Sequence, residues 1–308
     1  MTAALRLGTR ASLLATTQSR HVAEAITAAT GRAVELVPIT SEGDVLTGPL
    51  AQMGGTGVFA TALRDALLRG ECDLLVHSMK DLPTAPFPGI VVGAVPVRQS
   101  PRDVLCARDG LTLATLPQGA RVGTGSPRRV AQLLAARPDL EVAGIRGNVD
   151  SRLKKVADGE FDAIVLAEAG LRRIGREAAI TDVLPWPTSA AQGALAVELR
   201  ADDADGEIGA AVAAVEDPAA ALEAALERAV LNRLEAGCAA PVAIDAVHGA
   251  DAVTLVAEVY AEDGTRSVRA ERRLATTDID VATVAADVVH ELFEGGAADL
   301  ADLAGSSR

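Results

Sequence analysis

The sequence predicts an α/β protein with two lobes built on mixed, mainly parallel sheets, followed by a small C-terminal α+β domain with a three-stranded antiparallel sheet. Over the first two thirds of the chain, short apolar runs that end in Gly, Thr, Ser or Pro alternate with helical stretches. This alternation restarts after Arg98. After Asp217 the rhythm changes to consecutive β-type runs separated by turn residues. The length of 308 residues suits two or three domains.

The first lobe is predicted from a βαβ alternation. Ser12 is suited to cap a helix that runs to about Ala29, and residues 58–69 carry apolar side chains at helical spacing. The predicted strands are Ala4 to Gly8, Ala33 to Ile39, Asp73 to His77 and Gly89 to Val95. Their nearly continuous apolar character is typical of strands buried on both faces.

The second lobe repeats the pattern. Helices are expected to start near Ser126, Asn148 and Glu168. The predicted strands are Asp103 to Ala107, Ala120 to Gly123, Leu140 to Ile145 and Asp162 to Leu166. Pro185 and Pro187 mark a crossing segment, after which the strand Ala194 to Leu199 is expected to return to the first lobe. We therefore assign residues 1–97 and 190–213 to the first lobe and 98–189 to the second.

The C-terminal domain is assigned to residues 214–308. Pro218 opens a long Ala- and Leu-rich helix that ends near Leu234. Three strands follow, separated by Gly249 and by the Asp263-Gly264 turn, and a helix from Asp280 to Phe293 ends the domain. The predicted strands are Val242 to Val247, Val253 to Tyr260 and Ser267 to Leu274.

Composition excludes several classes of protein. The longest uncharged stretch, Val45 to Leu63, is broken by glycines and Pro49, so no membrane-spanning helix is expected. Residues 1–12 lack the apolar segment of a secretory signal. The three cysteines, with no C-x-x-C pair, argue against a disulfide framework or a thiolate metal cluster. The four histidines show no ligand spacing, so we expect no metal. Since neither a membrane-spanning helix nor a secretory signal is predicted, we expect a cytoplasmic protein.

The charge is unevenly distributed along the chain. The net charge is −13, yet residues 98–176 hold 14 Lys and Arg against 9 Asp and Glu. A nucleic-acid partner is not expected, because the overall charge is negative and only one Trp, one Tyr and four Phe are available for base stacking. The arginines of the middle segment need another explanation.

Several arginines lie where predicted strands end or helices begin. The carboxyl ends of strands line the ligand crevice in α/β sheets, and a guanidinium group matches carboxylate or phosphate. The sequence therefore predicts an anionic ligand, with ordinary solvated surface arginines as the alternative. The residues concerned are Arg10 with Ser12, then Ser126, Arg128 and Arg129, and finally Arg146 and Arg152.

Two further groups are candidates for chemistry. Asp81 follows a predicted strand beside Lys80, where a fixed carboxylate serves proton transfer or stabilises a developing cation, or merely forms an ion pair that orders the loop. Cys72 and Cys106 lie in apolar runs and are expected to be buried and inert. Cys238 lies in a loop and is a candidate nucleophile or attachment site, with a chance loop cysteine as the alternative.

Nine segments together resemble the porphobilinogen deaminase family, from about Leu5 to the end of the chain, in the family's order and spacing. They are Thr9-Arg10-Ala11-Ser12, His77-Ser78-Met79-Lys80-Asp81-Leu82-Pro83, Pro101-Arg102-Asp103, Val122-Gly123-Thr124, Ser126-Pro127-Arg128-Arg129, Arg146-Gly147-Asn148-Val149, Ala169-Gly170-Leu171, Gln192-Gly193 and Leu234-Glu235-Ala236-Gly237-Cys238. The resemblance implies two lobes like those of periplasmic binding proteins plus a C-terminal α+β domain.

The resemblance also implies an activity. Four porphobilinogen molecules are condensed into linear hydroxymethylbilane with release of ammonia, in tetrapyrrole biosynthesis. One dipyrromethane cofactor per chain is held through a thioether to the loop cysteine, here Cys238. Each pyrrole carries an acetate and a propionate, which accounts for the arginines. The resemblance implies a monomer with no nucleic-acid or membrane partner.

Roles follow for individual residues by the same resemblance. The catalytic residues are Asp81, Lys80 and Arg10. Asp81 would stabilise the cation formed when ammonia leaves and would handle the pyrrole protons. The cofactor would be bound by Cys238, Ser12, Lys80, Asp81, Thr124, Ser126, Arg128, Arg129, Arg146 and Gly147. The substrate would be bound by Arg10, Arg146, Arg152, Arg173, Phe59 and Gln192.

The Gly-rich segment Gly54 to Gly57 departs from the family pattern. The family usually carries lysines where this chain has Thr56 and Thr61, and it commonly has Ser-Ser where this chain has Gly125-Ser126. The segment lacks the lysine and serine of a phosphate-binding loop, so we expect it to act as a movable cover.

Two other functions remain open on the sequence. The lobes alone permit a protein that binds a small carboxylate without chemistry, because a fold does not determine a function. A thiol redox enzyme would need a second cysteine close to Cys238, and the sequence has none nearby.

Overall fold

The computed structural model describes residues 3–39, 58–236, 240–277 and 279–303. The chain divides into two compact units, Met1–Gln99 with Gly193–Leu222 and Ser100–Gln192 with Glu223–Arg308. The second unit thus contains both the second α/β sheet and the C-terminal sheet. The three domain limits expected from the sequence stay a prediction.

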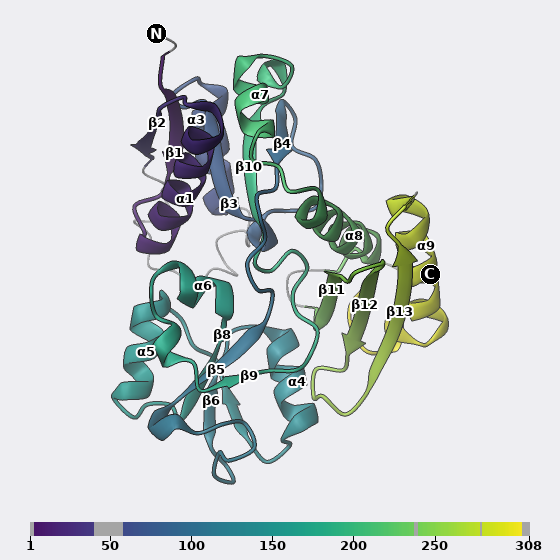
Figure 1. Ribbon diagram of the computed structural model, residues 1–308. Helices are drawn as coiled ribbons and strands as arrows, with labels where there is room; N and C mark the ends of the chain where they lie inside the picture. The colour runs from purple at the N-terminus through teal and green to yellow at the C-terminus, as the bar shows by residue number, and fades with distance from the viewer. Residues whose placement is uncertain (1–2, 40–57, 237–239, 278, 304–308) are drawn as a thin grey trace. The chain divides into compact units, whose positions relative to one another are not determined.

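The first unit is built on a five-stranded sheet in the order β2-β1-β3-β10-β4 (Figure 1). β1 pairs in parallel with β2 and β3, whereas β10 pairs antiparallel with β3 and β4. The elements are β1 (Leu5–Thr9), α1 (Leu13–Thr30), β2 (Val34–Pro38), α3 (Val58–Leu68), β3 (Leu74–Ser78), β4 (Ile90–Ala94), β10 (Leu195–Arg200) and α7 (Glu207–Ala213). The prediction that the strand after the crossing segment joins the first sheet is confirmed by these pairings.

Local sequence signals explain where α1 lies. The Ser12 side chain accepts a hydrogen bond from the amide of Ala15, and Gly31 ends the helix in the left-handed conformation. The helix buries Val22 and Ile26 against Leu5 and Leu7 of β1. Residues 9–12, which follow the C-terminal end of β1, are thereby fixed beside the end of β3.

The second unit contains a sheet in the order β7-β6-β8-β5-β9. β6 pairs in parallel with β7 and β8, and β5 pairs antiparallel with β8 and β9, so the predicted mixed sheet is confirmed. The elements are β5 (Asp103–Ala107), β6 (Arg121–Gly123), α4 (Pro127–Ala136), β7 (Glu141–Ala143), α5 (Val149–Ala157), β8 (Ala163–Ala167), α6 (Glu168–Arg173) and β9 (Asp182–Val183). Ser126 and Asn148 cap α4 and α5, as their positions predicted.

The C-terminal part forms the predicted antiparallel sheet, β11-β12-β13, with α9 packed against it (Figure 1). The elements are α8 (Pro218–Leu234), β11 (Val242–His248), β12 (Ala252–Tyr260), β13 (Ser267–Ala275) and α9 (Val281–Glu294). Short 3₁₀ turns complete the chain: η2 (Met79–Asp81), η3 (Arg108–Gly110), η4 (Glu177–Ala179), η5 (Ala201–Asp203) and η6 (Ala297–Asp299).

This sheet is attached to the second sheet within the same unit. Tyr260 and Ala243 pack on Ala131 of α4, and the amide of Ile244 donates to the carbonyl of Thr188 at 2.8 Å. The contacts place β11 and β12 directly beside α4. No described helix is both long and apolar enough to cross a membrane.

Candidate active site

The first unit contains a cavity of about 290 Å³ at the C-terminal ends of β1 and β3. Both strands run in parallel, so the residues that follow them meet at one edge of the sheet. The cavity is lined by Arg10, Ser12, Leu14, Ala15, Gln18, Ala60, Leu63, Val76, His77, Ser78 and Asp81. Three residues proposed from the sequence, Arg10, Ser12 and Asp81, therefore share one cavity.

The short η2 helix presents the expected catalytic carboxylate. Met79 is buried and anchors the turn, while Asp81 is exposed at its end and reaches the cavity. Lys80 is half-buried in the same turn and is not among the lining residues. An aspartate beside an arginine in a partly enclosed cavity is suited to stabilise a cation or to move a proton.

The sequence analysis missed polar cavity residues on α1 and β3. Gln18 Nε2 donates to Ser78 Oγ at 2.8 Å, and both side chains line the cavity. Leu14 and Gln18 are four residues apart on α1 and therefore lie on the same face of the helix. This spacing, counted from the helix start after Ser12, is the sequence signal that could have identified them as cavity residues. Gln18 and Ser78 add polar groups to the lining of the cavity, and Leu14 adds an apolar one.

His77 was expected to be a packed residue at the end of its strand. Its side chain is 9% exposed, and it lines the cavity as well. Its Nε2 lies 3.3 Å from the carboxylate of the buried Glu198, which also binds Arg64. The expected packing is confirmed, and His77 additionally connects the cavity wall to this buried ion pair.

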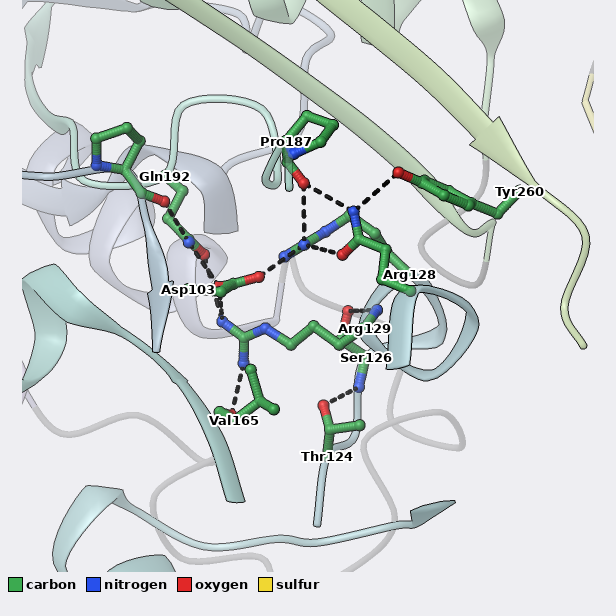
Figure 2. Close-up of polar contacts among 11 residues, drawn as sticks. Asp103, Thr124, Ser126, Arg128, Arg129, Val165, Pro187, Gln192 and Tyr260 are labelled. Atoms are coloured by element: carbon green, nitrogen blue, oxygen red, sulfur yellow. Dashed lines mark hydrogen bonds and ion pairs between the residues drawn. The ribbon is translucent and has the colours of Figure 1, made fainter. Parts of the chain in front are cut away.

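The second unit brings together the adjacent arginines of α4. Asp103, at the start of β5, is fully buried and accepts hydrogen bonds from Arg128 Nη1 at 2.7 Å and from Arg129 Nη2 at 2.6 Å (Figure 2). Burial by itself raises the pKa of Asp103, but the charges of the two arginines and their hydrogen bonds hold it well below its usual range. This buried group therefore holds two cations and one anion.

Two residues expected to bind the cofactor hold the N-terminus of α4 in place. Thr124 Oγ1 accepts from the amide of Ser126, and Ser126 Oγ accepts from the amide of Arg129 (Figure 2). The first of these distances is 3.2 Å, and Thr124 is buried. They fix the start of the helix that carries the arginine pair.

The turn after β7 carries the next group of candidates. Arg146 and Gly147 are exposed, and Gly147 has φ 111°, a conformation that favours glycine. Its carbonyl accepts from Arg152 Nε at 2.7 Å. Burial, and then the positive charge of Arg129, lower the pKa of Arg152.

Two residues expected to bind substrate are buried in the second unit. Arg173, in α6, is 8% exposed, and burial lowers its pKa to about 10. Gln192 is 1% exposed, and its Nε2 donates to Asp103 Oδ1 at 2.8 Å and to the carbonyl of Pro101 at 2.6 Å. The side-chain amide of Gln192 thus helps to hold the carboxylate that Arg128 and Arg129 share.

Comparison with known proteins decides the family. Residues 5–208 match the family model "Porphobilinogen deaminase, dipyromethane cofactor binding domain", and residues 221–292 match "Porphobilinogen deaminase, C-terminal domain". The chain belongs to the porphobilinogen deaminase family.

Curated relatives carry the family's name over nearly the whole chain. The chain is 53% identical to porphobilinogen deaminase of Leifsonia xyli, covering 98% of this chain and 95% of the relative. It is 55% identical to porphobilinogen deaminase of Thermobifida fusca, and this match covers 95% of this chain and 94% of the relative. Among solved structures it is similar to an ABC transporter periplasmic substrate-binding protein of Coxiella burnetii, at 17% identity, with a TM-score of 0.44, covering 73% of this chain and 96% of that one.

The residues of the second unit fit the family's dipyrromethane cofactor, whose side chains are carboxylates. Arg128, Arg129 and Arg152 contribute three positive charges, and Asp103 neutralises one of them. In addition, Arg129 Nε is buried and has no hydrogen-bond partner in the part of the chain that the structure describes. A buried donor without an acceptor and an excess of positive charge both suit a carboxylate ligand.

Three of the expected site features lie outside the described residues. These are Cys238, the side chain of Phe59 and the segment Gly54 to Gly57 with Thr56. Thr61 is described and lies exposed on α3. Cys72 and Cys106 are buried, as expected, and burial raises their pKa to about 11 and about 12; their inertness stays a prediction.

Proposed function

We propose that the chain condenses four porphobilinogen molecules into linear hydroxymethylbilane on a dipyrromethane held by Cys238. Its membership of the porphobilinogen deaminase family carries this proposal. The excess of buried positive charge beside Asp103 supports it, because the substrate and the product are rich in carboxylates. We assign the reaction to the transferases, since each step moves a pyrrolylmethyl group onto a growing chain and releases the amino group as ammonia.

The residues of the first unit are proposed to carry the bond-forming chemistry. In each step the C–N bond of the aminomethyl group breaks, ammonia leaves, and a C–C bond forms to a pyrrole α-carbon, which then loses its proton. The dipyrromethane, when bound, supplies the first such carbon. The Asp81 carboxylate stabilises the positive charge that develops as ammonia leaves, and it accepts the proton.

Arg10 and Lys80 are proposed to assist Asp81. Arg10 lines the same cavity and is placed to bind a substrate carboxylate. Lys80 is the neighbour of Asp81 in η2 and adds a positive charge beside it. The cavity is partly enclosed, and charges interact more strongly there than in bulk water.

The residues of the second unit are proposed to bind carboxylates of the cofactor and the growing chain. Thr124, Ser126 and Gly147 would support this function by fixing the backbone around the arginines. The guanidinium groups concerned are those of Arg128, Arg129, Arg146, Arg152 and Arg173. Phe59 and Gln192 complete the proposed set of substrate contacts.

We further propose a monomeric protein of the cytoplasm, with no nucleic-acid or membrane partner. The sequence has only three cysteines and no C-x-x-C pair, a usage typical of a reducing compartment. The net charge of −13 opposes binding to nucleic acid and to anionic lipid. Light scattering coupled to size exclusion should give a mass near 31.5 kDa, and a mass of twice this value would contradict the monomer.

Intact-protein mass spectrometry tests the proposed function. The freshly purified protein should carry an additional mass of two pyrrole units, and Cys238→Ser should abolish it. Cys106→Ala is the matched control, because this thiol is buried and should not carry the adduct. A bare polypeptide mass, together with no release of ammonia from porphobilinogen, would instead favour a protein that binds a small carboxylate without chemistry.

A further inference from the structure

The carboxylate of Asp103 divides its two oxygens between two buried guanidinium groups. Oδ2 accepts from Arg128 and Oδ1 from Arg129, and Figure 2 shows the carboxylate lying between them. The side chains of Asp103, Arg128 and Arg129 are 0%, 4% and 9% exposed. Removing such charges from water costs several kcal/mol per ion unless they are paired. Asp103 pairs two cations with one anion, so the described residues leave one positive charge uncompensated.

Further contacts hold each guanidinium from a second side. Gln132 Oε1 accepts from Arg128 Nη1 at 2.8 Å, and the carbonyl of Val165 accepts from Arg129 Nη1 at 2.9 Å (Figure 2). Both arginines are therefore fixed between a carboxylate oxygen and a second acceptor. Groups held in this way lose little side-chain entropy when they bind a ligand.

Gln132 is itself fixed by two acceptors. Its Nε2 donates to the carbonyl of Pro187 at 2.8 Å and to the hydroxyl of Tyr260 in β12 at 3.2 Å. Its side chain is 2% exposed. The contact with Arg128 thus belongs to a hydrogen-bond network that extends to the C-terminal sheet, and Gln132 cannot turn away without breaking the network.

The arrangement leaves capacity for an anion. Among the described residues, Arg129 Nε is buried without a hydrogen-bond partner, and the positive charge of Arg129 lowers the pKa of the neighbouring cation Arg152. A second carboxylate from the protein would neutralise the pair and remove its attraction for a ligand. With no carboxylate at all, two buried like charges would repel each other.

We propose that Asp103, supported by Gln132, positions the Arg128–Arg129 pair to bind a carboxylate of the dipyrromethane. Asp103 neutralises one of the two positive charges, so the pair keeps a single positive charge to match that carboxylate. The inference rests on the proposed function, since it takes the dipyrromethane as the ligand. Asp103 and Gln132 act through the two arginines, so they are positioning residues and not catalytic ones.

Asp103→Asn is the first test. It keeps the size of the side chain and removes the charge that orients both guanidinium groups. The fraction of folded protein that carries the two-pyrrole mass should fall at least tenfold, measured by intact-mass spectrometry on the monomeric peak. An adduct fraction equal to that of the wild type would overturn the inference, whereas a wild type without adduct would instead overturn the proposed function.

Asp162→Asn is the matched control. Asp162 binds Arg108 at 2.6 Å and accepts from the amide of Arg121 at 2.7 Å, at the opposite ends of the same strands. The control also breaks an Asp–Arg pair of this sheet, so it should lower the melting temperature and leave the adduct fraction unchanged. An equal loss of adduct in both variants would show that Asp103 acts through stability alone, and would also overturn the inference.

Two conservative variants cover the case in which Asp103→Asn does not fold. Asp103→Glu retains the charge but displaces it by one methylene group, so it should fold while the adduct fraction stays below that of the wild type. Gln132→Met keeps the volume and frees Arg128 on one side, and it should lower the adduct fraction severalfold. Full adduct in both folded variants would contradict the inference.

Discussion

The guanidinium group of Arg64 binds the carboxylate of Glu198 through two hydrogen bonds, from Nε at 3.0 Å and from Nη2 at 2.5 Å. The two side chains come from α3 and β10 and are 6% and 2% exposed. Burial by itself raises the pKa of Glu198, but its contacts with His77 and Arg64 outweigh this effect and lower it to about 2. The first unit thus contains an ionised carboxylate beneath its cavity.

Acid should destabilise the first unit through Glu198. The folded-state pKa lies below the unfolded value, so this stabilisation is present above about pH 4.5 and is lost as the pH falls towards 2. The shift corresponds to roughly 3 kcal/mol. In Glu198→Gln the free energy of unfolding should be lower at pH 7 by about this amount, and the difference should shrink at pH 3. Urea titrations at both pH values test this, and a difference independent of pH would contradict it.

Gly147→Ala should destabilise the turn after β7. At φ 111° a Cβ atom is strained, and it would lie 2.2 Å from Ser151 Oγ, which bonds to the carbonyl of Asn148. A cost of about 1–3 kcal/mol is expected for such a conformation. Gly144→Ala is the control, because a Cβ there meets nothing within 4 Å. Thermal unfolding of both variants tests this, and an equal effect at the two positions would refute the assigned strain.

The buried thiols should resist alkylation in the native state. Burial raises the pKa of Cys72 to about 11 and that of Cys106 to about 12, so neither forms thiolate at pH 8. Native protein treated with iodoacetamide should gain no label at these two positions, and protein in guanidinium chloride should gain both. Peptide mapping by mass spectrometry reads out each site, and rapid native labelling of Cys106 would contradict its burial.

Asp81→Ala should abolish turnover of porphobilinogen. The carboxylate lines the cavity with Arg10, and an alanine there can neither stabilise a cation nor accept a proton. Release of ammonia should fall by at least about a hundredfold, in the range expected for general acid–base catalysis. Asp65→Ala, an exposed aspartate of α3 outside the cavity lining, is the control and should retain activity. Wild-type turnover in Asp81→Ala would exclude the proposed role.

Local signals in the sequence predicted most helices and strands. Ser126 and Asn148 cap helices where their side chains bond the first free amides, and Pro218 opens α8. The sequence analysis did not predict α7, because its segment Glu207–Ala213 is only seven residues long and carries the weak helix former Gly209 in its interior. It also missed β9, two residues long, which exists only through pairing with β5.

Sequence patterns located part of the candidate site. Arg10, Ser12 and Asp81 were expected at strand ends, and they line one cavity. Arg128 and Arg129 were expected to be available for an anion, and the structure adds the carboxylate that they share. No spacing rule predicts that contact, because Asp103 lies 25 residues before Arg128 along the chain.

The amino-acid sequence by itself determined the alternation of strands and helices, the caps and the identity of the polar groups at strand ends. These depend on hydrogen bonds and apolar periods that span only a few residues. Only the tertiary structure decided which charges meet. Asp103, Arg129 and Gln192 come together because β5, α4 and the segment after β9 pack side by side within one unit. This packing depends on the whole sheet. The buried charges that suit this unit to a carboxylate therefore come together only in the folded chain.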